Sequence, residues 1–165
     1  MLAEARARRL EAVAAHPVSE LLECPPETVG LLTVAARTIT FEAGDVIFRQ
    51  LSACSGLYLV VQGQLMRRTE RLDMRIALGT TRPGELVELA AALGDGQHTY
   101  SLVAQSAGSL LLLPMDALKK AFESYPPLRM KLLEELAREV SRAYHACSVA
   151  RRTRSRRSSA RTQTV

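Results

Sequence analysis

The sequence lacks several features that mark particular protein classes. It has no tryptophan, only 4% aromatic residues, and three cysteines at wide spacing. An odd number of scattered cysteines predicts no disulfide framework and fits reduced thiols in a cytoplasmic protein. No apolar run approaches the roughly eighteen residues that a membrane-spanning helix needs. The N-terminus also lacks the long apolar core of a signal peptide.

Motifs for catalysis and metal binding are missing as well. The sequence contains no Cys-x-x-Cys pair, no glycine-rich phosphate loop and no Gly-x-Ser-x-Gly nucleophile motif. We therefore expect neither an enzyme nor a metalloprotein. What is present is a chain of 165 residues, 47% hydrophobic and 24% charged, which suits one ordinary soluble domain.

The positive charge is concentrated at the C-terminal end. The net charge is +5, yet residues 151–165 contain six arginines and no acidic residue. Without them the chain has 16 basic against 17 acidic residues, a charge of −1. The net positive charge therefore comes from a C-terminal tail and not from a basic face of the folded domain. The six are Arg151, Arg152, Arg154, Arg156, Arg157 and Arg161.

The first part of the chain predicts helices. Residues 1–16 are rich in helix-forming residues until Pro17 interrupts them, so we expect a helical extension over residues 1–17. Residues 19–22 predict a helical turn, and residues 25–36 predict a further helix that opens with prolines.

Residues 37–114 predict short strands separated by glycine-centred turns. Their spacing of roughly ten residues is typical of a sandwich or a barrel. The predicted strands cover residues 37–41, 46–48, 56–61, 65–68, 75–78, 100–104 and 109–113.

Helical periodicity returns after the strands. Residues 115–124 predict one helix, and a second begins at Pro126 or Pro127 and runs to about Val149. Residues 150–165 have no apolar period and predict a disordered basic tail.

Four short motifs follow one another through the strand region. They are Phe41–Phe48, Gly56–Gly63, Arg82–Glu85 and Ser109–Leu118. In this order, between these helices, they resemble the cyclic-nucleotide-binding domain of catabolite activators, protein kinase A regulatory subunits and gated channels. The resemblance implies an α+β fold over residues 18–149. Its core is a jelly-roll-like β-roll, flanked by N-terminal helices and a long C-terminal helix.

The phosphate-binding cassette of that family has a partial match here. The family pattern is Gly-Glu-Leu-Ala, then a short helix, then an arginine about ten residues after the glutamate. The resemblance implies that the glutamate binds the ribose hydroxyl, while helix N–H groups and the arginine bind the cyclic phosphate. The candidate ligand-binding residues are therefore Glu88, Leu89, Ala90, His98 and Thr99.

Three departures weaken this match. His98 stands at the arginine position, and a neutral imidazole offers one hydrogen bond and no permanent charge. Val87 replaces the glycine before the glutamate, where we expect the backbone to need a positive φ or close phosphate approach. Residues 50–54 lack the family's glycine–acid turn. Losing a charge-assisted bidentate contact costs about 1.5–3 kcal/mol, so we expect no tight binding of cyclic AMP or cyclic GMP.

The long helix carries an apolar stripe that allows two arrangements. The helix folds on its own roll, or it forms the seam of a homodimer through residues 128–147, which the regular spacing favours. Tyr144 is a candidate for stacking on a purine base, although its helical spacing favours a packed position in the stripe. The stripe consists of Leu128, Leu132, Leu136, Val140, Tyr144 and Cys147.

The arginine tail allows a second kind of contact. Residues 151–161 can bind nucleic acid or an acidic membrane surface by counterion release, although the tail has no aromatic residue for base stacking. About fifteen residues follow the predicted helix. They are too few for the helix-turn-helix domain found in transcription factors of the resembled family.

These observations predict a stand-alone cytoplasmic regulatory module that is not an enzyme. It keeps a degenerate cyclic-nucleotide pocket, has no certain cofactor and acts through a protein partner. Two alternatives stay open. One is a genuine sensor of a cyclic nucleotide or dinucleotide. The other is a nucleic-acid- or membrane-associated accessory protein that uses the arginine tail.

Overall fold

A computed structural model of the chain describes residues 23–71 and 74–161. Helices α2 (Pro26–Ala35) and α4 (Met115–Ser124) confirm two of the predicted helices. The helical extension predicted for residues 1–17 and the turn predicted for residues 19–22 lie outside the described residues.

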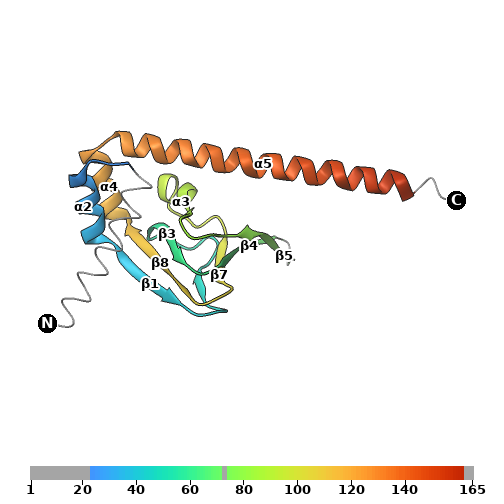
Figure 1. Ribbon diagram of the computed structural model, residues 1–165, viewed down its shortest axis with the longest axis horizontal. Coiled ribbons are helices and arrows are strands. Elements are labelled where there is room, and N and C mark those ends of the chain that lie inside the picture. Colours follow the sequence, from blue (N-terminus) through green and yellow to red (C-terminus); the bar gives the residue numbers. More distant parts are fainter. Residues whose placement is uncertain (1–22, 72–73, 162–165) are drawn as a thin grey trace.

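In the described part of the chain, eight strands form two antiparallel sheets, which confirms the predicted β-roll (Figure 1). The strand order is β1-β8-β3-β6 in one sheet and β2-β7-β4-β5 in the other. The short β6 was not predicted. The strands are β1 (Arg37–Phe41), β2 (Val46–Phe48), β3 (Gly56–Gln62), β4 (Leu65–Arg71), β5 (Met74–Thr80), β6 (Leu86–Val87), β7 (Ser101–Ala104) and β8 (Gly108–Pro114).

Strand β8 contains four consecutive leucines, Leu110–Leu113, because both of its faces are buried there. Leu111 and Leu113 pack with residues of the helices, whereas Leu110 and Leu112 pack inside the roll. Successive side chains of a strand point to opposite faces, so a strand between two cores needs an uninterrupted apolar run. Strand β3, beside β8, divides its side chains between the same two cores. The sheet that contains β3 and β8 therefore contributes to both cores, one shared with the helices and one inside the roll.

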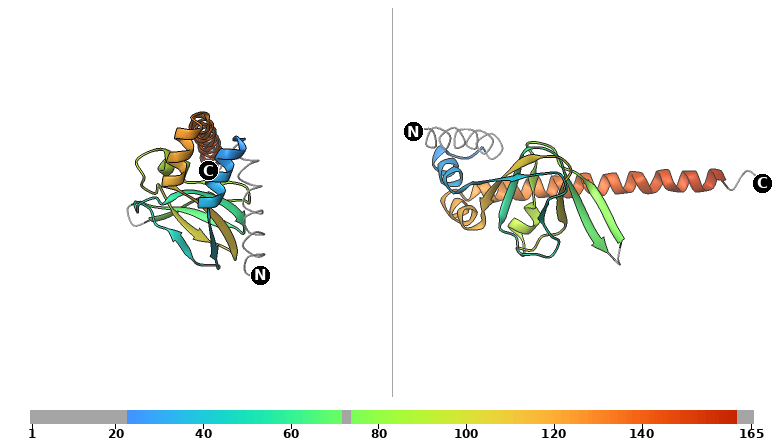
Figure 2. Two further views of the ribbon diagram at one scale, coloured as in Figure 1. Left: turned by 90° about the vertical axis from the view of Figure 1, so that its left-hand side faces the viewer. Right: turned by 90° about the horizontal axis from the view of Figure 1, so that it is seen from below.

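The last helix, α5 (Pro127–Arg161), crosses above α3 (Leu89–Leu93) and continues past the roll (Figures 1 and 2). It begins where predicted but does not end near Val149, so the predicted disordered tail is wrong for residues 150–161. No glycine or proline occurs after Pro127 to end the helix, and alanine and arginine favour it. Within the described residues, no helix is long and apolar enough to cross a membrane.

Candidate functional site

The cassette opens with a backbone turn at Glu88, between β6 and α3. Glu88 has a φ of 71° and a ψ of 33°, in the left-handed region that costs most residues roughly 1–2 kcal/mol. Val87 is an extended, buried residue of β6. Our expectation that the missing glycine at position 87 would matter for positive φ is therefore wrong, because the unusual conformation lies one residue later. Strain of this kind persists only where surrounding contacts fix it.

Contacts of the Glu88 carboxylate hold this turn in place. The carboxylate is buried and accepts hydrogen bonds from the Thr99 backbone N–H (3.3 Å) and the Thr99 hydroxyl (3.1 Å). His98 Nδ1 lies 3.2 Å from the same carboxylate, without the alignment of a hydrogen bond. The structure thus brings Glu88, His98 and Thr99 together. Leu89, the first residue of α3, packs into the core, and Ala90 is exposed on the same helix.

The His98 ring belongs to the interior of the roll. The ring is 1% exposed and stacks on Phe48, with centroids 3.7 Å apart and planes inclined by 4°. Tyr58 lies beside it, with ring centroids 6.0 Å apart. The imidazole is therefore enclosed by aromatic side chains and the Glu88 carboxylate.

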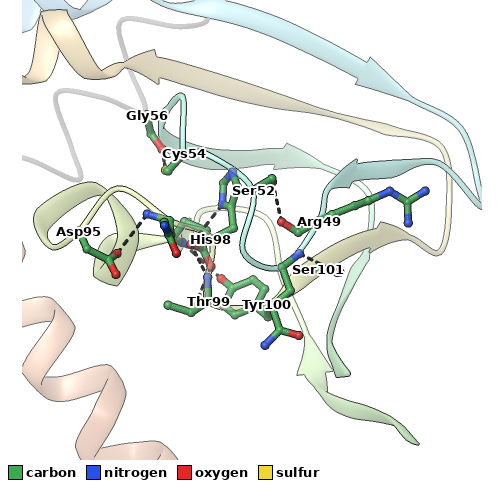
Figure 3. A network of polar contacts seen from close by, with 12 residues as sticks. Arg49, Ser52, Cys54, Gly56, Asp95, His98, Thr99, Tyr100 and Ser101 are labelled. Atoms are coloured by element: carbon green, nitrogen blue, oxygen red, sulfur yellow. Dashed lines mark hydrogen bonds and ion pairs between the residues drawn. The ribbon is translucent and has the colours of Figure 1, made fainter. Parts of the chain in front are cut away.

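The loop that lacks the family's glycine–acid turn is paired with the end of the cassette. Leu51 N–H donates to the His98 carbonyl (2.8 Å), and His98 N–H donates to the Ser52 carbonyl (2.9 Å; Figure 3). Cys54 N–H donates to the Gly96 carbonyl at 2.7 Å. These bonds fix the backbone on both sides of His98 and so help to hold its ring inward.

Tyr100 is a site residue that the sequence did not reveal. Its side chain is 8% exposed, and its hydroxyl accepts the Glu88 backbone N–H at 3.3 Å, just before α3. The Arg67 guanidinium lies over the Tyr100 ring, 5.8 Å from its centroid. Burial, together with the nearby Glu88 carboxylate, raises the Tyr100 pKa far above its ordinary value, so the hydroxyl stays protonated. The backbone donor beside the cassette helix is thus occupied by a side chain of the protein.

The charges around the cassette have an acidic balance. Burial lowers the pKa of His98, opposed by Glu88, so the imidazole is neutral at pH 7. Arg67 pairs with Glu85 (3.3 Å) and with Glu139 of α5 (4.0 Å). Three carboxylates, those of Glu85, Glu88 and Glu139, against one guanidinium give a formal charge of −2. Within this cluster, the Arg67 guanidinium is already shared by the carboxylates of Glu85 and Glu139.

Tyr144 is not part of this cluster. Its side chain is 73% exposed on α5, and its ring contacts that of His145 with centroids 6.2 Å apart. Val140, one turn earlier, is 60% exposed, whereas Leu128 and Leu132 are buried in the core of this chain. The first half of the stripe therefore packs on its own roll. Val140 and Tyr144 are uncovered, so the favoured packed position of Tyr144 is not found within this chain.

The buried histidine gives the stability a defined pH dependence. The pKa of His98 is lower in the folded chain than its ordinary value of about 6.5. The unfolded chain therefore binds more protons between the two values, and stability falls as pH drops below about 6.5. We expect His98→Gln to remove up to about 1.4 kcal/mol per pH unit of this slope, measured by urea unfolding from pH 7.5 to 5. His145→Gln, at an exposed histidine, is the control. An unchanged slope in His98→Gln would contradict burial of a neutral ring.

Sequence comparison assigns the family. Residues 38–125, more than half of the chain, match the family described as "Cyclic nucleotide-binding domain". The chain belongs to this family of regulatory domains. No functionally curated protein is significantly similar to it in sequence.

Solved structures of regulators share the fold. The catabolite activator protein of Thermus thermophilus is 25% identical over 81% of this chain and 62% of that one, with a TM-score of 0.68. The sensor domain of the regulator DNR from Pseudomonas aeruginosa is 18% identical (76% and 91% covered, TM-score 0.66). The regulatory domain of Toxoplasma gondii PKA, crystallised with cAMP, is 17% identical, with a TM-score of 0.63. That alignment covers 67% of this chain and 44% of the Toxoplasma chain. The chain thus spans less than two thirds of the Thermus and Toxoplasma proteins.

Proposed function

We propose that the chain is a regulatory domain whose cyclic-nucleotide pocket is degenerate and whose output is a protein partner. The observation that carries this proposal is the His98 side chain at the position of the family's arginine. It is neutral, 1% exposed and stacked on Phe48. A ring held in this way supplies no permanent charge to a cyclic phosphate.

The guanidinium–phosphate contact that His98 cannot make is strong, so its absence supports weak nucleotide binding. A bidentate contact between a guanidinium and a phosphate is charge-assisted and about twice as strong as a neutral hydrogen bond. Its loss costs about 1.5–3 kcal/mol, which is ten- to a hundredfold or more in affinity. The formal charge of −2 around the cassette adds repulsion toward an anionic ligand.

The uncovered part of α5 supports a second copy of the chain as one partner. Val140 and Tyr144 extend the buried positions Leu128 and Leu132 along the helix, but they are exposed in a single chain. An apolar stripe of this kind on two copies can pack around a two-fold axis.

Light scattering after size exclusion tests this dimer. We expect a dimeric mass for the full chain and a substantial shift toward monomer in Val140→Glu and Tyr144→Glu, because each buries a charge in the seam. Ser141→Glu, at an exposed neighbouring position, adds the same charge and should leave the mass unchanged. A monomeric full chain, or a dimer that is equally stable in all variants, would contradict a seam at Val140 and Tyr144.

Melting temperature with and without nucleotides tests the proposed function. A ligand that binds only the folded chain stabilises it by about 2.7 kcal/mol at one hundred times its Kd. We expect no rise with cyclic AMP, cyclic GMP or cyclic dinucleotides at millimolar concentration. A rise equivalent to about 2.7 kcal/mol at 1 mM of any of them, which means a Kd of about 10 μM or below, would overturn the degenerate pocket and favour a ligand sensor.

A further inference from the structure

A chain of side-chain contacts connects the cassette to α5. It begins at the Glu88 backbone N–H, which donates to the Tyr100 hydroxyl at 3.3 Å. The Tyr100 ring lies under the Arg67 guanidinium, 5.8 Å from centroid to Cζ. Arg67 Nη2 is 4.0 Å from Glu139 Oε1 on α5. Arg67 belongs to β4 and Glu139 to α5, and Tyr100 comes just before β7.

The burial of Arg67 makes this arrangement costly to rearrange. Its side chain is 17% exposed, and its Nε is buried without a hydrogen-bond partner among the described residues. Glu85, which comes just before β6, also pairs with the guanidinium at 3.3 Å. If α5 moved away, Arg67 would lose one of its two carboxylates while remaining largely buried, which is unfavourable for a charged group.

The ion pair between Arg67 and Glu139 lies beyond the part of α5 that is buried against the core. The helix packs on α3 and α4, with Leu128 and Leu132 buried and Leu136 partly buried against the core. Glu139 lies about one turn beyond Leu136, beside the exposed Val140. The ion pair with Arg67 therefore extends the attachment of α5 beyond the buried part of its apolar stripe.

We propose that Tyr100, Arg67 and Glu139 form a built-in bridge that holds α5 against the roll without any bound ligand. The proposal rests on the proposed function in one respect, that no nucleotide occupies the cassette. The bridge connects the cassette turn to α5 through side chains of the protein. The position of α5 therefore does not depend on a ligand. Tyr100, Arg67 and Glu139 are positioning residues in this device.

Hydrogen exchange on the full chain, with no nucleotide added, tests the bridge. We expect Tyr100→Phe and Glu139→Gln each to speed amide exchange in α5 residues 133–142 by about two- to tenfold, because each loosens one link. The double variant should exchange no faster than the more affected single variant. Amides of β8 report global stability and should change little. Glu135→Gln, which removes a carboxylate paired within α5 to Arg138 and Arg142, is the matched control.

Two outcomes would overturn the bridge. One is exchange in Glu139→Gln or Tyr100→Phe at the rate of the Glu135→Gln control. The other is a double variant whose effect equals the product of the two single effects, as for independent sites. If a variant also accelerates exchange in β8, Arg67→Met replaces it, because this change keeps an apolar stem of similar length. Nucleotide binding by the wild-type chain would overturn the proposed function but not these exchange rates, so the two can fail separately.

Discussion

Replacing Glu88 by alanine is expected to lower the free energy of unfolding by about 3 kcal/mol, measured by urea denaturation at pH 7. The carboxylate is buried and accepts two hydrogen bonds from Thr99. Its removal takes away a buried charged acceptor with two hydrogen bonds and leaves a gap beneath the Glu88 turn, whereas Thr99 itself is exposed. A hydrogen bond to a charged group contributes about 1.5–3 kcal/mol, so the loss of the two bonds to the Glu88 carboxylate accounts for an effect of this size.

A second substitution at the same position separates the side chain from the backbone. Glu88→Gly loses the same hydrogen bonds but relieves the left-handed φ of 71°. We expect Glu88→Gly to be more stable than Glu88→Ala by about 1 kcal/mol. Glu135→Ala, on the surface of α5, is the control and should change stability little. Equal stability of the glycine and alanine variants would contradict the left-handed turn, and a harmless Glu88→Ala would contradict the buried network.

The largest effect on ligand binding is expected from restoring the cation and opening the space that Tyr100 fills. Tyr100→Ala alone removes the ring and frees the Glu88 backbone N–H. His98→Arg in that background adds a permanent guanidinium at the cassette. We expect the double variant to bind cyclic AMP at least tenfold, and up to about a hundredfold, more tightly than Tyr100→Ala, as measured by calorimetry.

The matched control for this gain is lysine at the same position. His98→Lys in the Tyr100→Ala background adds the same charge without the planar fork of a guanidinium, so its gain should be smaller. If His98→Arg leaves the affinity of the Tyr100→Ala variant unchanged, the missing cation is not what limits nucleotide binding.

Most of the fold could be predicted from local patterns. The alternating or apolar runs with glycine turns predicted seven of the eight strands, and the helical period predicted α4 with its observed bounds. Strand β6 was missed because two residues, Leu86 and Val87, are too few for any periodicity. The predicted end of α5 near Val149 is wrong because the missing apolar period beyond it does not exclude a helix. A helix that leaves the roll needs no apolar face of its own.

The site could be predicted only in part. The ten-residue step from Glu88 to His98 placed both residues in one cassette, because motif spacing follows the local backbone. The inward direction of the His98 ring and the burial of Tyr100 depend on Phe48 and Arg67, which come from other strands. No local pattern reports such contacts. The sequence likewise indicated an unusual backbone near the cassette but assigned it to Val87 instead of Glu88.

The most direct measurement is a calorimetric titration of the wild-type chain with cyclic AMP and cyclic GMP at pH 7. With a neutral, buried His98 and an acidic cassette, we expect no saturable heat at ligand concentrations up to about 1 mM. A stoichiometric binding curve for either nucleotide, with a Kd of about 10 μM or below, would show tight binding. The wild-type pocket would then bind a cyclic phosphate without the family's arginine. That result would contradict the central claim.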